Sequence, residues 1–360
     1  MNGRTLIIAE AGVNHNGDQE MALELIREAH KAGADIVKFQ TFKAKNLVTA
    51  GAEQAAYQSA NMGKQESQLS MLERLELSYE HHHALVSLCD TLGIEFLSTA
   101  FDSESLAFLT QELGLKRLKI PSGELTNAPL LLEHAQCGCD LIVSTGMATL
   151  AEIEQALGVI AFGMLHPKAH AGNEIAFAQA YASTEGQALL KQKVTLLHCT
   201  TEYPAPLDEI NLCAMNTMSH AFSLKVGYSD HSDGWVVPVA AVARGATVIE
   251  KHFTLDQSLP GPDHKASLEP DQLANMICAI RQTEVILGNG IKMPTVSELG
   301  NKEVARKSLV AAQSIKCGDV FSESNLAVKR PGSGMSPHKY WSLLGVKASK
   351  DYNIGDLLDE

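Results

Sequence analysis

The sequence predicts a (β/α)₈ TIM barrel followed by a small, mostly β module. Eight strand-like apolar runs alternate with helix-like segments within residues 1–285, which is the element count of such a barrel. Polar residues stand at the carboxyl end of nearly every run, where these barrels place their active sites. Beyond residue 285 the pattern changes to short strands with Gly-Asp turns. A doubly wound open sheet is the main alternative, but that architecture does not call for eight strands in particular.

The strand-like runs are rich in β-branched and other apolar residues. In order, they are residues 5–14, 34–42, 94–101, 116–124, 140–147, 194–204, 224–232 and 247–255. Helical periodicity fills several of the gaps, as in residues 21–34 and 80–94. Gly33 and Gly93 stand just before the next strand, so each is predicted to end a helix. The histidines at 81–83 follow Ser78, a helix start, and are predicted to form a solvated first turn.

Composition excludes several classes of protein. The net charge of −13 argues against general nucleic-acid binding, which requires a basic surface. No apolar stretch approaches the roughly 20 residues that span a bilayer, and the first residues lack a signal-peptide pattern. The seven cysteines include no C-x-x-C pair, which fits reduced thiols in a cytoplasmic protein and neither a zinc site nor a disulfide framework. We therefore expect no nucleic-acid or membrane partner.

The polar residues at the strand ends are predicted to converge on one cup. Side chains alternate between the two sides of a strand, so Lys38 shares a side with Gln40, while Lys251 points away from its neighbours. The strand-end residues are Glu10, Lys38, Gln40, Thr99, Lys119, Ser122, Ser144, Thr200, Ser229, His231, Glu250 and His252. A cup of this kind at the carboxyl face of a barrel is typical of an enzyme.

Two histidines, His231 and His252, end the seventh and eighth runs, which are neighbours in a barrel. Two imidazoles with nearby carboxylates and open positions suit a divalent ion such as Mn²⁺. The alternative is a pair of unrelated, hydrogen-bonded histidines. His15 and His198 could equally be catalytic or structural, and His264 has no assigned role.

Two lysines, Lys38 and Lys119, end the second and fourth runs. With the hydroxyls of Ser122, Ser144 and Ser229 they predict a site for a phosphate or a carboxylate. The alternative is that both ammonium groups reach solvent. Four carboxylates are candidates for acid–base work or for binding sugar hydroxyls: Glu10, Glu124, Glu250 and Asp263.

The carboxyl-terminal part differs in character from the barrel. Residues 286–303 carry Gly, Pro and polar residues and predict a linker. Residues 304–360 form a module of about 55 residues, which is marginal for an independent core. We expect it to dock on the barrel or on a neighbouring subunit. Its basic segment KRPGSG (329–334) is either a surface turn or a segment that reaches a ligand from outside the barrel.

Nine short motifs follow one another in the order found in one enzyme family. They are AEAGVNHNG, KFQT, KIPSGE, STGM, HCTTEYP, GYSDH, EKHFT, PGPDH and VKRPG. On these motifs the chain resembles the bacterial sialic acid (nonulosonate) synthases, which include N-acetylneuraminate and N,N'-diacetyllegionaminate synthases. The resemblance covers essentially the whole chain, and the tail resembles the antifreeze-like (SAF) domain of that family.

The resemblance implies a metal-dependent condensation of phosphoenolpyruvate with an open-chain 2-acetamido sugar related to mannose. The product is a nine-carbon 2-keto acid, formed with release of phosphate by C–O cleavage. It also implies that His231 and His252 bind the metal, Mn²⁺ first and Mg²⁺ or Co²⁺ as alternatives. Because an enol phosphate is a weak carbon nucleophile, the sugar aldehyde needs such activation.

The same resemblance divides the site residues between the two substrates. Phosphoenolpyruvate contacts are expected from Lys38, Thr99, Lys119, Ser122, Ser144 and Ser229. Sugar contacts and acid–base groups are expected from Glu10, Gln40, Tyr203, Glu250, Asp263 and Arg330, with Glu124 close to both substrates. In this family the arginine comes from the partner subunit, which implies a domain-swapped homodimer.

The sequence departs from the family pattern in two places. Some members carry Asn where Thr201 stands, so one anion contact is open, and the loop at 55–68 is closer to the diacetyllegionaminic acid branch. One rival function is a phosphoenolpyruvate-condensing barrel that makes a seven- or eight-carbon keto acid from a phosphorylated sugar. It would need further basic residues, and no extra Arg cluster stands at the strand ends. The other rival is a non-catalytic carbohydrate- or ice-binding protein.

Overall fold

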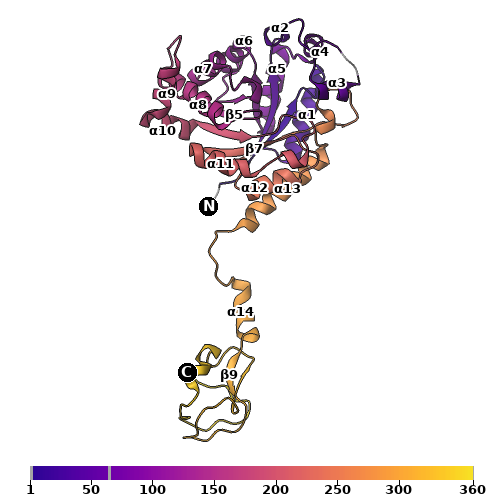
Figure 1. Ribbon diagram of the computed structural model, residues 1–360. Coiled ribbons are helices and arrows are strands. Elements are labelled where there is room, and N and C mark those ends of the chain that lie inside the picture. Colours follow the sequence, from indigo (N-terminus) through magenta and orange to yellow (C-terminus); the bar gives the residue numbers. More distant parts are fainter. Residues whose placement is uncertain (1–2, 64–65, 360) are drawn as a thin grey trace. The chain divides into compact units, whose positions relative to one another are not determined.

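The computed structural model describes residues 3–63 and 66–359. The chain divides into two compact units, residues 1–288 and 289–360, and the first contains a ring of strands surrounded by helices (Figure 1). No helix in the described ranges is long and apolar enough to cross a membrane. The seven cysteines all lie in these ranges as free thiols, as the sequence predicted.

Eight parallel strands form a closed barrel in the order of the sequence. They are β1 Leu6–Gly12, β2 Ile36–Thr41, β3 Glu95–Ala100, β4 Arg117–Ile120, β5 Asp140–Ser144, β6 Val194–His198, β7 Lys225–Asp230 and β8 Val248–His252. Closure comes from β1 pairing with β8, in a register that sets Glu10 beside His252. The predicted TIM barrel is confirmed, and each strand lies inside one of the eight predicted runs.

An apolar layer inside the barrel supports the polar cup above it. Six buried residues, one from each of six strands, form this layer: Ile8, Ile36, Leu97, Ile142, Leu197 and Val248. Each stands two positions before a residue that lines the cup, because alternation turns both toward the barrel axis. The matching position of β7 is Gly227, where a Cβ would lie 2.4 Å from the carbonyl oxygen of Val248. Only glycine fits there.

Helices cover the outside of the barrel and bury a second, larger apolar cluster against the strands. The main ones are α1 Gln19–Ala32, α5 Tyr79–Leu92, α6 Ser103–Ala107, α7 Ala128–Gln136, α8 Leu150–Leu165, α11 Cys213–Phe222, α12 Val236–Ala243 and α13 Pro270–Leu287. Asp18 and Ser78 cap the amino ends of α1 and α5, and Gly33 and Gly93 end these helices in the left-handed conformation. The predicted helix ends are therefore confirmed.

Two excursions interrupt the strand–helix alternation. Residues 42–78, which we call the β2–α5 excursion, contain α2 Ala44–Leu47, α3 Ala56–Met62 and α4 Gln68–Leu75. Between α8 and β6 lie α9 Glu174–Ala182 and α10 Thr184–Lys193. The first excursion matters for function, because it contributes to the cavity described below.

The solvated first turn predicted at residues 81–83 is wrong for its central histidine. His82 is fully buried, with one ring nitrogen 2.8 Å from Thr41 Oγ1 and the other 2.9 Å from the carbonyl oxygen of Ser78. Burial lowers the pKa of His82 to about 4. The ring is therefore a neutral part of the packing between α5 and β2.

The second unit contains a small sheet and its own apolar cluster. β9 Ser308–Ala311 and β10 Leu326–Lys329 pair antiparallel, and isolated bridges such as Ile315 with Tyr352 extend the β structure. The stretch predicted as a linker differs from expectation, because it contains the helix α14 Val296–Ala305. Thr295 and Glu298 form a capping box at the start of α14.

Candidate active site

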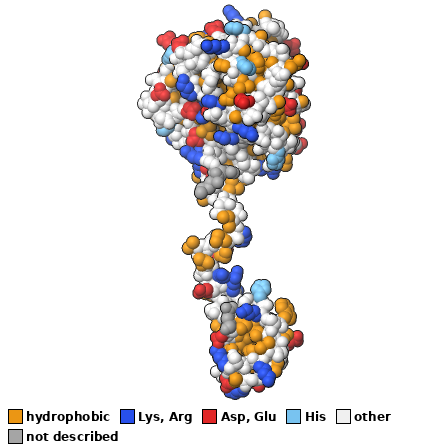
Figure 2. Space-filling model, turned by 90° about the vertical axis from the view of Figure 1, so that its left-hand side faces the viewer, with side chains coloured by type: hydrophobic (Ala, Val, Ile, Leu, Met, Phe, Trp, Pro, Cys, Tyr) orange, Lys and Arg blue, Asp and Glu red, His pale blue; other side chains and the backbone are white. Residues whose placement is uncertain are grey.

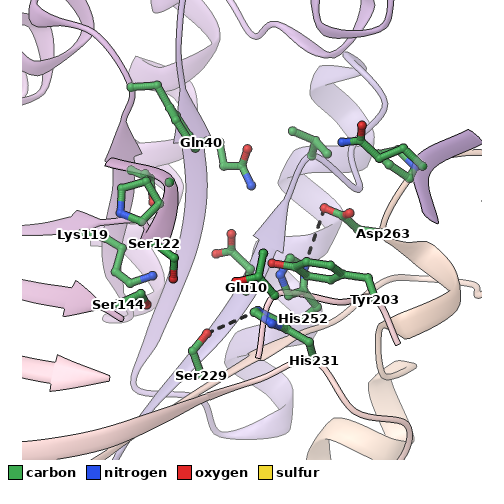
Figure 3. Close-up of a pocket in the computed structure, with 18 of the residues that line it drawn as sticks. Glu10, Gln40, Lys119, Ser122, Ser144, Tyr203, Ser229, His231, His252 and Asp263 are labelled. Carbon is green, nitrogen blue, oxygen red and sulfur yellow. Dashed lines mark hydrogen bonds and ion pairs between the residues drawn. The ribbon is translucent and has the colours of Figure 1, made fainter. Parts of the chain in front are cut away.

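A cavity of about 300 Å³ opens at the carboxyl ends of the strands (Figure 3). Every predicted site residue of the barrel lines it. These residues are Glu10, Lys38, Gln40, Thr99, Lys119, Ser122, Glu124, Ser144, Tyr203, Ser229, His231, Glu250, His252 and Asp263. The strand ends therefore converge on one cup, as predicted, except for Thr200, which does not line this cavity and whose Oγ1 donates to the carbonyl of Glu209.

Two lysines and two glutamates form a buried charge cluster in the cavity. Lys38 Nζ lies 2.7 Å from Glu10 Oε2 and 3.7 Å from Glu250 Oε2, while Lys119 Nζ lies 3.0 Å from Glu250 Oε1. Both lysine side chains are less than 5% exposed, which excludes the alternative that their ammonium groups reach solvent. The cluster places two cations where a small bound anion can pair with them in place of the glutamates.

The two glutamates have opposite pKa shifts. Burial raises the pKa of Glu10 to about 7, against the opposing charge of Lys38. Burial would also raise the pKa of Glu250, but Lys119 and Lys38 outweigh it and lower this pKa to about 2. Glu250 is thus a fixed anion, whereas Glu10 can gain or lose a proton near neutral pH, as general acid–base work requires.

Glu250 is held between the two lysines of the cavity. Its Oε1 accepts hydrogen bonds from Lys119 Nζ and from Ser229 Oγ, both at 3.0 Å, and its Oε2 faces Lys38. A carboxylate held between two lysines belongs to the anion-binding part of the cavity. The sugar contact that the resemblance implies for Glu250 stays a prediction.

Hydroxyl groups complete the part of the cavity around the lysines. Thr99 Oγ1 lies 3.3 Å from Lys38 Nζ, and Ser122 Oγ accepts from the backbone N–H of Gly146 at 2.9 Å. The hydroxyls of Ser144 and Thr201 are buried without a hydrogen-bond partner. Buried polar groups are normally paired, so these two hydroxyls indicate a site for a polar ligand.

The two histidines at the ends of β7 and β8 face one another, with ring centroids 5.5 Å apart. His231 Nδ1 donates to the carbonyl oxygen of Thr200 at 2.6 Å, which leaves Nε2 unprotonated, 3.5 Å from Ser229 Oγ. Burial lowers the pKa of His231 to about 4 and that of His252 well below its ordinary value. Both rings are therefore neutral near pH 7.

This histidine pair fits a divalent ion. Metal-binding imidazoles are neutral and donate their other N–H to a carbonyl or carboxylate, as His231 does. His252 Nδ1 is buried without a hydrogen-bond partner and lies 3.9 Å from Asp263 Oδ2. The described residues contain no group of three or more His, Cys, Asp or Glu arranged for a metal. Substrate and water would have to supply the other ligands.

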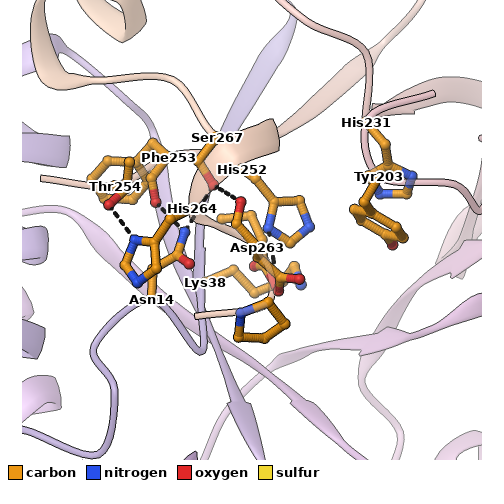
Figure 4. Close-up of polar contacts among 12 residues, drawn as sticks. Asn14, Lys38, Tyr203, His231, His252, Phe253, Thr254, Asp263, His264 and Ser267 are labelled. Carbon is orange, nitrogen blue, oxygen red and sulfur yellow. Dashed lines mark hydrogen bonds and ion pairs between the residues drawn. The ribbon is translucent and has the colours of Figure 1, made fainter. Parts of the chain in front are cut away.

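A polar network fixes the loop that carries Asp263 (Figure 4). Asn14 Nδ2 donates to the carbonyl of Phe253 and to Ser267 Oγ, and Ser267 Oγ donates to the carbonyl of Asp263 at 2.7 Å. His264, which had no assigned role, bonds to Thr254 Oγ1 at 2.7 Å. Burial raises the pKa of Asp263 to about 6. The network ties β1, β8 and this loop together and so positions Asp263 in the cavity.

The remaining histidine candidates are structural. His15 Nδ1 accepts from the backbone N–H of Gly17, and His198 Nε2 donates to the carbonyl of Ile210. Burial lowers the pKa of both rings, that of His15 to about 3. Neither ring lines the cavity.

Arg330 lies in the second unit and is exposed, with its Nε donating to the carbonyl of Ala305. Its expected sugar contact remains a prediction.

Several cavity residues were not singled out from the sequence. Cys199 follows β6 and lies 3.2 Å from Ser122 Oγ; its place in HCTTEYP, two residues beyond Leu197, could have indicated it. Tyr57, Gln58 and Met71 come from the β2–α5 excursion. No strand alternation marks these three, so the sequence offered no signal beyond the unusual loop.

Comparison with known proteins identifies the family. A model of the NeuB family matches residues 25–292, and a model of the SAF domain matches residues 306–360. The chain belongs to the NeuB family. It is 49% identical to N,N'-diacetyllegionaminic acid synthase of Campylobacter jejuni, over 99% of both chains. It is 45% identical to the Legionella pneumophila protein of the same name, over 98% of this chain and 92% of that one.

A solved structure supports the same assignment. The N-acetylneuraminic acid synthetase of Leptospira borgpetersenii, crystallised with citrate, superposes with a TM-score of 0.66 at 32% identity. The match covers 83% of this chain and 90% of that one. NeuB membership confirms the resemblance inferred from the nine motifs and the prediction of an enzyme of this class, with its carboxyl-terminal SAF domain.

Proposed function

We propose that this NeuB-family protein condenses phosphoenolpyruvate with 2,4-diacetamido-2,4,6-trideoxymannose to give N,N'-diacetyllegionaminate and phosphate. The observation that carries the proposal is one cavity that combines two buried lysines with two neutral, facing histidines. Two relatives at 45–49% identity carry the name of this synthase, which favours the diacetamido acceptor over N-acetylmannosamine.

In the proposed reaction, Lys38 and Lys119 hold the phosphate and carboxylate of phosphoenolpyruvate. The hydroxyls of Thr99, Ser122, Ser144 and Ser229 add hydrogen bonds. Bound phosphoenolpyruvate pairs with these two ammonium groups, which pair with Glu10 and Glu250 in the free protein.

Bond making and breaking follow from this placement. C3 of phosphoenolpyruvate attacks the aldehyde carbon and forms the new C–C bond, while Asp263 gives a proton to the aldehyde oxygen. Water then adds at C2 and releases a proton to Glu10. The C2–O bond to phosphate then breaks, and the C2 hydroxyl gives its proton to the departing phosphate, which leaves the 2-keto group and inorganic phosphate. Gln40, Tyr203 and Glu124 bind the sugar hydroxyls near the reacting carbon.

The cofactor that we propose is Mn²⁺, with Mg²⁺ or Co²⁺ as alternatives. His231 Nε2 and the ring of His252 would hold it, and a bound divalent ion polarises a carbonyl oxygen. Support comes from the neutral rings and from the Nδ1 bond of His231 to a backbone carbonyl.

We further propose a domain-swapped homodimer, in which Arg330 of a second copy reaches the sugar. Hydrophobic side chains reach the protein surface in Figure 2. In the second unit they include Ile291, Met293 and Val296, each more than 60% accessible. Exposed apolar side chains that are close in sequence are consistent with a subunit contact. The free thiols are consistent with the proposed cytoplasmic location.

The test is phosphate release from phosphoenolpyruvate with Mn²⁺, comparing the diacetamido sugar with N-acetylmannosamine. The proposal expects a strong preference for the diacetamido sugar. Preference for N-acetylmannosamine would instead make the protein an N-acetylneuraminate synthase. No release with either sugar, in folded and metal-loaded protein, would contradict the proposed condensation.

A further inference from the structure

The cavity has two linings of different chemistry. The strand ends and the loops after β4, β7 and β8 supply all of its lysines, histidines, glutamates and aspartates. The β2–α5 excursion supplies the opposite kind of surface: none of its described residues that line the cavity carries a charged side chain. An anion and an uncharged ligand are therefore accommodated by different parts of one cavity.

The apolar residues that the β2–α5 excursion contributes form one wall of the cavity. Leu47 and Val48 come from the end of α2, and Met71, Leu72 and Leu75 come from one face of α4. Met71 and Leu75 are buried in a cluster with Val13 and Phe42, so the surface is anchored to the barrel. A hydroxyl group pressed against it loses its bonds to water without replacement, whereas a methyl group gains contact.

Two amide side chains interrupt the apolar surface. Gln58 and Gln68 line the same cavity, and Gln58 Oε1 accepts from the backbone N–H of Ala55 at 2.9 Å. This bond orients the side chain, which also interacts with Tyr57, and an amide N–H group of Gln58 can donate to a ligand carbonyl. An acetamido group combines an amide with a methyl, and both parts find a matching partner on this wall.

Contacts across the cavity hold α3 in place. The ring of Tyr57 stacks on Tyr203, with centroids 4.9 Å apart, and Asn61 Nδ2 donates to the carbonyl of Pro262 at 2.8 Å. Tyr203 in turn packs against His231 at 4.1 Å. The wall is therefore linked to the residues proposed to surround the aldehyde.

We propose that the cavity-lining residues of the β2–α5 excursion (42–78) contact the half of the acceptor sugar that lies farthest from its aldehyde. They select a methyl group at C6 and a second acetamido group at C4 over hydroxyls at both positions. The inference rests on the proposed condensation, in which the donor occupies the lysines. The acceptor carbons farthest from the aldehyde then lie against the lining that carries no charge.

The decisive comparison uses N-acetylmannosamine and its 6-deoxy derivative, which differ only at C6. In the wild type, kcat/KM is expected to favour the 6-deoxy sugar by roughly 10- to 100-fold, the range for one group in an apolar pocket. Leu72→Asn is expected to reduce this preference about tenfold. Leu72→Met should preserve it, as should Glu73→Gln on the exposed side of the same helix.

Two further variants test the same inference without Leu72→Asn, in case that variant does not fold. Val48→Thr keeps the shape of the side chain but exchanges one methyl group for a hydroxyl, and it should also reduce the C6 preference. Gln68→Leu should reduce the preference for the 2,4-diacetamido sugar over the 2-acetamido 6-deoxy sugar. Unchanged preferences in both variants, with phosphate release intact, would overturn the inference. Absence of phosphate release in the wild type would instead contradict the proposed condensation.

Discussion

The two linings of the cavity differ in how the chain builds them. The charged lining stands on the ends of β1–β8, whose backbone is fixed by the closed barrel. The uncharged lining stands on three short helices between β2 and α5. Reacting groups need precise placement, which barrel strands provide, whereas a connecting segment can change without disturbing the strands. We therefore expect the residues that carry out the chemistry to be separable from those that select the acceptor.

The largest expected effect comes from the charged lining. Lys119→Met should lower kcat/KM by about a thousandfold or more, because it removes a donor-binding cation and leaves Glu250 with only the more distant Lys38. Phosphate release measured with both acceptors should fall in parallel, leaving their ratio unchanged. Lys31→Met, at a mostly exposed lysine of α1, is the matched control. A changed ratio between the rates of phosphate release with the two acceptors in Lys119→Met would contradict the separate roles of the two linings.

A second effect concerns the metal. His231→Ala should weaken Mn²⁺ binding at least about 100-fold, because it removes one of only two proposed imidazole ligands. Bound manganese is measured by elemental analysis after equilibrium dialysis, without reference to activity. His198→Ala, outside the cavity, should retain the metal. Equal manganese in His231→Ala and wild type would contradict the proposed site.

A third effect is the pH dependence of stability. Folding raises the pKa of Glu10 from 4.5 to about 7, so the folded protein holds a proton that the unfolded chain releases within this range. The contribution of Glu10 to the free energy of unfolding should therefore fall as pH rises from 5 to 7, by up to ~3 kcal/mol. Asp263, with its pKa raised to about 6, adds a contribution of the same sign as Glu10. Buried histidines with lowered pKa, such as His82 and His231, contribute in the opposite direction, because the unfolded chain binds protons that they do not.

Urea unfolding of the wild type and of Glu10→Gln at pH 5 and pH 7 isolates the contribution of Glu10. Because the amide does not titrate, the change in the free energy of unfolding from pH 5 to pH 7 should be more positive in the variant than in the wild type, by up to ~3 kcal/mol. Glu250 contributes stability only above pH 4.5 and loses it as pH falls toward its folded pKa of about 2, so it does not affect this window. The same pH dependence in both proteins would show that the pKa shift lies elsewhere.

The smallest expected effect tests the loop of Asp263. Ser267→Ala removes the bonds that join Asn14 to the carbonyl of Asp263, and should cost about 1 kcal/mol of stability. Misplacement of Asp263 should also lower kcat about tenfold with little change in the KM for phosphoenolpyruvate. Ser267→Thr, which keeps the hydroxyl, should recover part of the loss. A loss in KM alone would argue against this positioning role.

Much of the charged lining could be predicted from the sequence, because it depends on local rules. Strand alternation and the polar strand ends were enough to bring Glu10, Lys38, Ser229 and His252 into one cup. The predicted opposite orientation of Lys251 is also confirmed: it is fully buried outside the cavity, 2.7 Å from Asp230 Oδ2.

The remaining features depend on contacts between distant segments. The burial of His82 requires β2 beside α5, which brings Thr41 to its ring. The position of Glu250 between two lysines requires barrel closure, since Lys38 and Lys119 stand more than 100 residues away in sequence. The uncharged wall lacks strand periodicity, so only the structure shows that Leu72 and Gln58 share a cavity with the histidines.

The most direct test of the central claim uses phosphoenolpyruvate labelled with ¹⁸O at the oxygen that bridges C2 and phosphorus. Purified, Mn²⁺-loaded protein is incubated with this donor and 2,4-diacetamido-2,4,6-trideoxymannose, and both products are analysed by mass spectrometry. The account predicts a nine-carbon 2-keto acid without label and phosphate that carries it, because the C2–O bond breaks. Label retained in the keto acid, or no nine-carbon product, would contradict the account.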